Sequence, residues 1–301
     1  MSTRLTLIHA MSPLHAGTGQ SVGAIDLPIA RERPTGIPLI PGSSIKGALR
    51  ARSQGKDAQM TRDVFGPDTA SSSDHSGSVQ FSDAHLLLMP VRSIRGTFAW
   101  VTSPYLLQRF ARGAREAKLD FSGLPASPKA NECCVLSETL SIPFQGGRRV
   151  VFEDLDFTVA DAQKPKLHSF TASLSQVLFP DGSRDFADWR QSLIDRICLI
   201  HDDMMSFLLA TATEVNAHIR LDSEAKTVER GGLWYQESLP TETVLAGIVV
   251  ASDVSAINGR TKQDAADLLG HVASLTNEIV QFGGKATTGQ GSCFVRIGGK
   301  P

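Results

Sequence analysis

Alternating apolar and polar positions predict β-strands at intervals along the whole chain. Strand patterns, alternating as in 4–10 and 78–83 or continuously apolar as in 86–91, also cover 96–102, 148–157, 239–251 and 292–297. Two further runs, 218–222 and 227–234, are separated by a short polar turn and predict a long hairpin. Apolar residues at helical spacing predict helices over 43–52, after Ser103-Pro104, over 186–216 and over 261–281.

The helices have predicted buried faces. These are formed by Ile45 and Leu49; by Leu106, Leu107 and Phe110; by Leu193, Ile197, Ile200, Met204 and Leu208; and by Leu268, Leu269, Val272, Leu275 and Ile279. The order of elements predicts an α+β, ferredoxin-like (RRM-like) βαββαβ core. Two polar or turn-rich segments, 53–77 and 120–147, would be insertions; the first would contain a flexible surface loop over 69–77, and the second would be irregular.

The overall charge of the chain excludes few classes of function. The 301 residues carry a formal net charge of −1, from 30 basic and 31 acidic residues, so the total does not indicate a nucleic-acid-binding protein. The basic residues are clustered, however, for example at Lys46/Arg50/Arg52 and Arg109/Arg112/Arg115. A pair such as Arg109 and Arg112 could contact RNA or simply form a solvated helix face.

Cysteine usage and the N-terminus indicate a cytoplasmic protein. The four cysteines at 133, 134, 198 and 293 contain no CxxC pair, which argues against a disulfide framework or a zinc site. The first residues, MSTRLTLIHAMSP, are too short and too polar for a signal peptide, and no run approaches a membrane span.

The stretch 11–52 combines features that suit a phosphate. His15-Ala-Gly-Thr-Gly19 is a small-residue loop, and Ser43 or Ser44 could cap the helix that follows. Lys46 and Arg50 share one face of that helix, beside its N-terminus. Such loops and capped helices occur in many folds, and neither a Walker loop nor a dinucleotide fingerprint is present. Phosphate binding therefore stays one alternative at this point.

Two other segments also allow either a functional or an ordinary structural interpretation. Gly283–Gly291 contains four glycines and Lys285 between a predicted helix and a strand, so it could present N–H groups to phosphates or only stop the helix and turn. Asp26 lies alone among apolar neighbours in Ile25-Asp-Leu-Pro-Ile29, where a turn or capping role is the ordinary interpretation.

Several runs together resemble one protein family. LHAGTGQSVGAIDLPIARERPTGIPLIPGSSIKGALR, and later GTFAWVTSPYLLQRF, resemble the RAMP proteins of CRISPR effector complexes. The chain looks most like the repeated backbone subunit of the type III-B (Cmr) complex. The resemblance implies one RAMP domain over 1–301, with a ferredoxin-like palm, a glycine-rich loop near the C-terminus and a protruding hairpin "thumb" over about 217–240.

The same resemblance implies a function and a set of site residues. The subunit would bind guide crRNA along a helical filament and cleave complementary target RNA at about six-nucleotide intervals. Asp26 matches the cleavage position, with His15 beside it, Glu237 as a weaker third candidate and a divalent metal, Mg²⁺, as cofactor, held by Asp26 through water. RNA contacts would come from Ser43, Ser44, Lys46, Arg50, Gly283, Gly284, Lys285, Gly289 and Gly291.

Trp234 and Tyr235 offer aromatic surface for stacking on bases, or for packing the hairpin base onto the palm. The expected partners are guide RNA, target RNA, further copies of the chain and other Cmr subunits. Three alternatives stay open: a non-cleaving structural guide-binding subunit, an enzyme acting on a small phosphorylated ligand, and a guide-processing nuclease. The Ile25–Ile29 run argues against the last, and the missing nucleotide fingerprint argues against the small-ligand enzyme.

Overall fold

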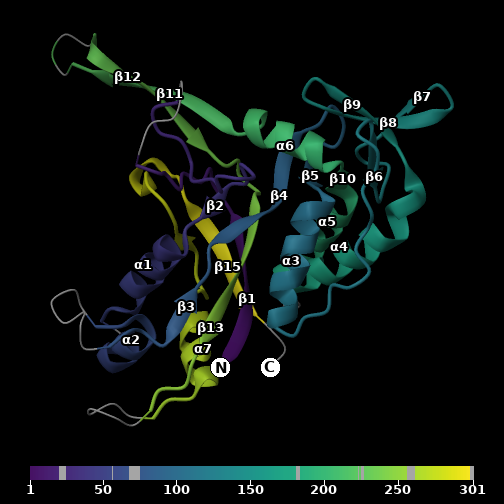
Figure 1. Cartoon of the computed structure of the whole chain (residues 1–301). Coiled ribbons are helices and arrows are strands. Elements are labelled where there is room, and N and C mark those ends of the chain that lie inside the picture. Colours follow the sequence, from purple (N-terminus) through teal and green to yellow (C-terminus); the bar gives the residue numbers. More distant parts are fainter. Residues whose placement is uncertain are drawn as a thin grey trace.

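A computed structural model describes residues 1–19, 25–55, 57–67, 75–180, 184–222, 224, 227–255 and 262–298. Figure 1 shows two lobes that share one continuous sheet, with a hairpin projecting from the end where they meet. The N-terminal strand β1 (Ser2–Ala10) lies between β13 (Val244–Ala251) and β15 (Ser292–Gly298), antiparallel to both. The first and last strands of the chain, β1 and β15, therefore lie side by side in the first lobe.

The sheet passes from the first lobe to the second through β4 (Ala84–Arg92). On the first-lobe side β13 pairs with β3 (Val79–Phe81) and β4, and β15 pairs with β14 (Val280–Gln281). The remaining strands extend the sheet beyond β4. In spatial order they are β5 (Phe98–Thr102), β10 (Ile197–Ile200), β6 (Glu132–Val135), β9 (Leu155–Val159), β8 (Gly147–Phe152) and β7 (Ile142–Phe144), while β2 (Leu39–Ile40) pairs with β4 off this path.

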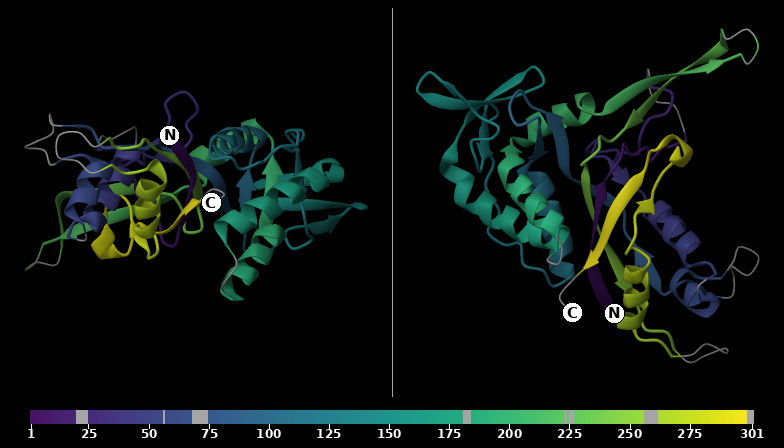
Figure 2. Two further views of the ribbon diagram at one scale, coloured as in Figure 1. Left: turned by 90° about the horizontal axis from the view of Figure 1, so that it is seen from below. Right: turned by 180° about the vertical axis from the view of Figure 1, so that it is seen from behind.

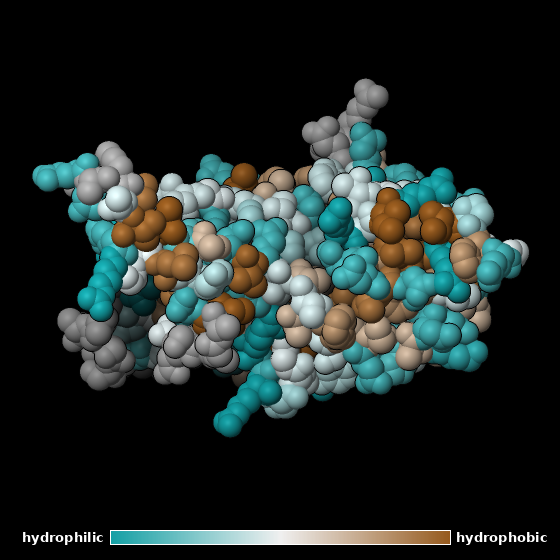
Figure 3. Space-filling model, turned by 90° about the horizontal axis from the view of Figure 1, so that it is seen from above, coloured by the Kyte–Doolittle hydropathy of each residue, from teal (hydrophilic) through white to brown (hydrophobic). Residues whose placement is uncertain are grey.

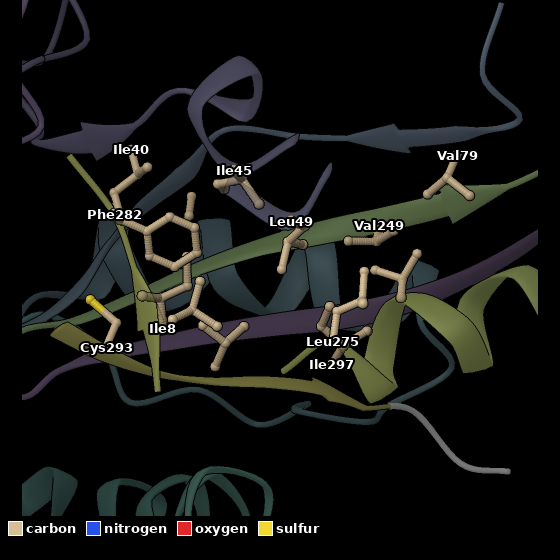
Figure 4. Close-up of a cluster of buried hydrophobic side chains, with 14 of the residues drawn as sticks. Ile8, Ile40, Ile45, Leu49, Val79, Val249, Leu275, Phe282, Cys293 and Ile297 are labelled. Carbon is tan, nitrogen blue, oxygen red and sulfur yellow. The ribbon is translucent and has the colours of Figure 1, made fainter. Parts of the chain in front are cut away.

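Each lobe has its own helices. In the first lobe α1 (Gly42–Ser53), α2 (Ala58–Phe65) and α7 (Ala265–Ser274) cover one face of the sheet (Figure 2). Figure 4 shows the core between them, where Ile45 and Leu49 of α1 meet Ile8, Val249 and Phe282. In the second lobe α3 (Pro104–Glu116), α4 (Lys164–Leu178), α5 (Arg184–Arg196) and α6 (Asp202–Thr211) pack on the sheet, with a short η2 turn (Asp161–Gln163) before α4.

The predicted hairpin is present and longer than expected. Strands β11 (Glu214–Leu221) and β12 (Val228–Ser238) form a separate two-stranded sheet in which Ala217 faces Tyr235. Its apolar side chains are solvent-exposed, including those of Val215, Ile219 and Leu233. Figure 3 views the end of the molecule that carries this hairpin, and hydrophobic residues form separate patches there.

The helix predicted over 186–216 is wrong. The chain forms α5, then the strand β10, then α6. Ile197–Ile200 is apolar at every position and buried on both faces, and periodicity alone cannot separate such a run from a helix. His201 then starts α6, because its Nδ1 accepts a hydrogen bond from the N–H of Asp203 (3.1 Å).

Other boundaries also differ. The helix predicted over 261–281 spans only Ala265–Ser274, residue 261 lies outside the described residues, and Ile279 is exposed rather than buried. The polar segment 53–77 contains α2, which Asp57 caps by accepting from the N–H of Met60 (2.9 Å). The segment 120–147, predicted to be irregular, contains β6 and β7. No helix in the described part of the chain is long and apolar enough to cross a membrane.

Candidate cleavage site and RNA-binding surface

The candidate site lies where two N-terminal segments meet the base of the hairpin. The first segment, 14–18, pairs with the second, 27–30, through the bridge between Gly17 and Ile29 and the hydrogen bond from the N–H of Ala30 to the carbonyl of Ala16 (2.7 Å). Leu14 also pairs with Leu239, immediately after β12. Backbone hydrogen bonds therefore hold both segments against the hairpin base.

Asp26 is exposed, and its position is set by β12. The N–H of Tyr235 donates to Oδ2 of Asp26 (2.8 Å), and the N–H of Leu27 donates to the carbonyl of Tyr235 (3.0 Å). The N–H of Glu237 donates in turn to the carbonyl of Leu27 (2.9 Å). Pairing with β12 thus holds the carboxylate at the hairpin base, with its side chain open to solvent.

His15 occupies a buried position between two loops. Its Nδ1 donates to the carbonyl oxygen of Glu237 (2.7 Å), so the proton on this nitrogen is already engaged. A Cβ on Gly17 would lie 2.7 Å from Nε2 of His15, and the N–H of Gly284 donates to the His15 carbonyl (3.1 Å). The ring therefore connects the N-terminal loop, the hairpin and the glycine-rich loop.

Glu237 is the side chain that joins most of these parts. It is only 3 % exposed, yet its carboxylate accepts hydrogen bonds from Nη2 of Arg31 (2.5 Å), Oγ1 of Thr213 (2.9 Å) and the N–H of Ile29 (3.1 Å). A buried carboxylate is stable only when it is paired and hydrogen-bonded, and these three donors supply both conditions. Glu237 therefore fixes the Asp26 segment to the start of the hairpin.

The glycine-rich loop connects β14 to β15, rather than a helix to a strand as predicted, and contains the short η3 turn (Ala286–Thr288). Gly283, Lys285, Gly289 and Gly291 have φ between 67° and 82°. The N–H of Gly291 donates to the carbonyl of Pro13 (2.9 Å), which attaches the loop to the N-terminal segment. Residues 283–289 are exposed and can present backbone groups to a ligand.

Gly283→Ala is expected to disturb the site more than Gly289→Ala. Both positions have left-handed φ, which costs a non-glycine residue about 1 kcal/mol. At Gly289 no atom lies near an added Cβ, whereas at Gly283 the Cβ would lie 2.2 Å from the carbonyl oxygen of His15. We expect Gly283→Ala to lower the melting temperature further than Gly289→Ala. Equal melting temperatures for the two variants would show that the loop does not need this close approach.

The two aromatic residues have different surroundings. The Trp234 ring stacks on His218 (centroids 5.6 Å apart, 14° between planes), and Nζ of Lys285 lies 5.9 Å from its centroid. Trp234 therefore lies between His218 of β11 and Lys285 of the glycine-rich loop. Tyr235 is 43 % exposed, and its backbone N–H holds the Asp26 carboxylate.

The predicted serine cap of α1 is wrong. Pro41 is the N-cap, and its carbonyl accepts from the N–H groups of Ser44 and Ile45, so Ser43 and Ser44 lie within the first turn and are exposed. The first N–H, that of Gly42, donates to Oδ1 of Asp83 (2.8 Å). A carboxylate 41 residues away along the chain thus occupies part of the helix N-terminus that was predicted to bind phosphate.

Some of the basic residues on α1 and α3 are already bound to other groups of the protein and are less available to bind RNA. Arg50 donates from Nη2 to the carbonyl of Pro67 (3.0 Å), whereas Lys46 makes no ion pair with any described residue. Arg109 binds Glu32 through two hydrogen bonds (2.6 and 3.1 Å), which together with a hydrogen bond from Thr35 lower the pKa of Glu32 to about 2. Of the predicted Arg109/Arg112 pair, Arg109 is therefore already neutralised.

A metal site is not built by the protein alone. The described residues contain no group of three or more His, Cys, Asp or Glu side chains able to hold a metal ion. Asp26 is a single exposed carboxylate, a donor that suits Mg²⁺ when waters and RNA phosphates supply the other ligands. The four cysteines are free and buried.

Comparisons with known proteins give matches that cover almost the whole chain. The RAMP superfamily model matches residues 7–294. The chain is 31 % identical to "CRISPR system Cmr endoribonuclease Cmr4" of Pyrococcus furiosus, over 99 % of this chain and 95 % of the relative. It is 24 % identical to "CRISPR system CMR subunit Cmr4" of Saccharolobus solfataricus, over 96 % and 94 % of the two chains.

Solved structures share the fold. Oligomeric Cmr4 from Pyrococcus furiosus superposes with a TM-score of 0.72 at 24 % identity, covering 100 % of this chain and 99 % of the other. A chain of the type III-B Cmr-beta complex bound to cognate target RNA also gives 0.72, at 20 % identity, covering 99 % and 97 %. The mixed α+β architecture with its large sheet is thus that of Cmr4 structures.

Proposed function

The chain belongs to the RAMP superfamily, and from that membership we propose that it is the backbone subunit of a type III-B CRISPR effector complex, an RNA endonuclease that holds guide RNA and cleaves target RNA. The observation that supports this most strongly is the full-length similarity to a Cmr endoribonuclease. Its partners are then guide RNA, target RNA, further copies of the chain and other Cmr subunits. We place its action in the cytoplasm, consistent with four free cysteines.

The proposed cleavage centre is Asp26. RNA can be cut when a 2′-hydroxyl attacks the adjacent phosphate in line, which forms a cyclic phosphate and breaks the bond to the 5′-oxygen of the next nucleotide. This needs a proton acceptor for the hydroxyl, a proton for the leaving oxygen and correct alignment. The Asp26 carboxylate is exposed at the hairpin base, fixed through Oδ2 by the N–H of Tyr235. It can accept the hydroxyl proton directly or hold a water that does so. A divalent cation bound at this carboxylate would neutralise charge on the phosphate.

His15 then acts as a positioning residue more readily than as a base. It is buried, its Nδ1 proton is held by the Glu237 carbonyl, and Gly17 packs close to Nε2, the nitrogen that would act as the base. Its carbonyl also accepts from Gly284, so one residue sets the spacing between the cleavage segment and the glycine-rich loop. His15 thereby connects the proposed cleavage segment to the loop that we propose binds the guide.

The proposed RNA surface follows from the same contacts. Tyr235 lies beside Asp26, Trp234 carries Lys285 above its ring, and Lys285 belongs to the exposed part of the glycine-rich loop. Ser43, Ser44 and Lys46 add hydroxyl groups and one cation on the outer surface of α1. Positive charge and backbone N–H groups of this kind bind phosphates without reading base sequence.

We interpret the first lobe as a ferredoxin-like palm and the β11–β12 hairpin as the thumb. The strand order β15-β1-β13-β3, antiparallel throughout, with α1 and α7 on one face, supports the palm. The hairpin's exposed apolar side chains support insertion between other molecules, because a lone two-stranded sheet is marginally stable in water.

Guide binding is tested by removing the unpaired cation of α1. Lys46→Ala is expected to weaken binding to guides of every sequence, and to reduce the salt dependence of log K by about one counterion. Arg50→Ala is the matched control, because that guanidinium is already bound to the Pro67 carbonyl and should contribute less. Filter-binding titrations over a salt series measure both effects. An unchanged salt slope in Lys46→Ala would remove α1 from the RNA surface.

A further inference from the structure

A cavity of about 630 Å³ lies where the base of the hairpin meets the second lobe. Its lining comes from the end of β4 with the start of β5, from the turn between β8 and β9, from the end of α6 with the start of β11, and from the segment 240–242 after β12. Figure 1 shows α6 at this junction. The lining includes none of the residues assigned above to cleavage or to RNA binding, and the volume is that of a ligand-sized site.

Carboxylates outnumber cations around this cavity. The side chains of Glu153, Asp154 and Glu214 line it, and none of them makes an ion pair with a described residue. The cation in the lining is Arg92, which is exposed and also without an ion pair in the described part of the chain. Three unpaired carboxylates therefore face one guanidinium.

Neighbouring charges do not cancel this excess. Glu242 also lines the cavity, and its Oε2 accepts from Nε2 of His9 (2.6 Å), so this carboxylate is already engaged. Arg196 is not part of the lining; its Cζ lies 5.8 Å from the ring centroid of Phe98, and its Nε and Nη1 donate to other groups of the protein. Even when Arg196 is counted together with Arg92, the three unpaired carboxylates outnumber the two cations.

Glu214 is the lining carboxylate that gains most from a cation. It is half-buried at the start of β11, and burial raises the pKa of its carboxyl. A cation close to this carboxylate would act in the opposite direction, because it favours the charged form. A buried charge without a partner is unfavourable. A positively charged ligand in the cavity would therefore stabilise Glu214 in its ionised form.

The cavity suits a large planar cation better than a metal ion. Among the described residues no three carboxylates lie close enough together to hold one metal ion. The rest of the wall is largely apolar and includes Leu155, Pro240 and Phe207, and the ring of Phe207 is 50 % exposed. A guanidinium is weakly hydrated, forms paired hydrogen bonds with carboxylates and stacks on aromatic rings. Arginine combines these properties in one side chain.

We propose that this cavity is a docking site for another protein subunit of the complex, which inserts an arginine side chain among the lining carboxylates and against the ring of Phe207. That the partner is a protein of the complex rests on the proposed function, whereas the preference for arginine rests on the cavity alone. RNA does not fit here, because its phosphates are attracted by cations and the excess charge of this surface is negative.

Two probes of nearly the same shape test the chemistry. N-acetylarginine methylamide carries a guanidinium where N-acetylcitrulline methylamide carries a neutral urea. We expect the arginine probe to bind the full chain about tenfold more tightly, because only its hydrogen bonds to the carboxylates are charge-assisted. Titrations followed by nuclear magnetic resonance measure both affinities. Equal affinities, or no binding of the arginine probe at millimolar concentration, would overturn the proposal.

Glu214→Gln locates the binding site. This variant should lose the preference for the arginine probe and keep its affinity for the citrulline probe, because it keeps the shape of the side chain and removes the charge. Asp188→Asn is the matched control: Asp188 is exposed on α5 and lies outside the cavity lining, so the preference should stay at the wild-type value. A preference that survives in Glu214→Gln would show that the probe binds elsewhere and would overturn the assignment.

The aromatic wall gives an independent test. Phe207→Ser should weaken binding of the arginine probe by about threefold, the effect of losing one cation–π contact. Phe144→Ser is the matched control, because Phe144 is 40 % exposed and lies outside the cavity lining; it should leave probe binding unchanged. If Phe207→Ser binds the probe as tightly as the wild type, the cavity is not the binding site.

The natural occupant is identified by crosslinking in the reconstituted complex. A benzoylphenylalanine in place of Phe207 should crosslink to a protein segment that contains an arginine, and the yield should fall when Glu214→Gln is combined with it. Crosslinks to RNA alone, to a segment without arginine, or to nothing would each overturn the docking proposal. The probe titrations use the chain without RNA, and none of these measurements reads guide binding or cleavage, so a failure here is distinguishable from a failure of the proposed function.

Discussion

Asp26→Asn is expected to reduce target-RNA cleavage by at least about 100-fold while guide and target binding stay unchanged. The amide oxygen of asparagine can still accept the hydrogen bond that Tyr235 donates to Oδ2, so the segment keeps its position. What is lost is the negative charge that accepts a proton or holds a metal. The effect is therefore predicted to fall on the rate of cleavage and not on assembly.

The measurement compares single-turnover cleavage rates with target affinity in the same reconstituted complex. Asp154→Asn, at an exposed turn between β8 and β9, is the matched control and should cut at the wild-type rate. If Asp26→Asn cleaves at the wild-type rate, Asp26 has no role in the cleavage reaction. Loss of target binding in that variant would show that the carboxylate serves binding instead.

Glu237→Ala is expected to lower the free energy of unfolding by about 3–5 kcal/mol, the range for removing one partner of a buried ion pair. The substitution leaves the guanidinium of Arg31 and the N–H of Ile29 without their acceptor in a region that is largely closed to water. Because these donors belong to the segment that carries Asp26, cleavage should fall as well. Urea unfolding followed by circular dichroism measures the stability.

Glu214→Gln is the matched control for this experiment. Glu214 lies at the start of the same hairpin, and burial raises the pKa of its carboxyl, so its charge is unfavourable there. Removing that charge should leave stability unchanged or increase it slightly. If Glu237→Ala fails to fold, Glu237→Gln keeps an acceptor and should show an intermediate loss. Wild-type stability in both Glu237 variants would contradict the connecting role of this side chain.

Local sequence patterns correctly predicted the strands and helices that have one buried face and one face that is exposed or half-buried. The strand at 292–297 alternates buried and half-buried residues, as its sequence indicates, and α3 buries Leu106, Leu107 and Phe110 as predicted. One failure, the helix predicted over 186–216, comes where both faces of a segment are buried. Ile197–Ile200 reads as part of a helix because all four positions are apolar, and only its place between β5 and β6 makes it a strand.

The candidate site depended more on family resemblance than on pattern. Asp26 is held by Tyr235, 209 residues later in the chain, and no local signal contains such a pairing. The cap prediction for α1 failed for the same reason. The first N–H of this helix is bound by Asp83, which is distant in the sequence, and not by a neighbouring serine. Trp234 and Tyr235 are adjacent in the sequence but, because strand residues alternate, one packs inward and the other faces solvent.

Glu237 shows what sequence reasoning could find only weakly. Its position near the hairpin suggested a third candidate for catalysis, but nothing local indicated that it would be almost fully buried. Only the fold shows that it holds Arg31, Thr213 and Ile29 together. The role supported by these contacts is positioning of the cleavage segment.

The most direct test of the whole account is a denaturing gel of end-labelled target RNA after incubation with the reconstituted complex, guide RNA and Mg²⁺. Repeated copies, each carrying one Asp26, predict a ladder of products spaced by about six nucleotides within the paired region. Every band should disappear together in a complex built from Asp26→Asn. A single product at one fixed position would reject the repeated backbone arrangement, and an intact target under tight binding would show that this chain holds RNA without cutting it.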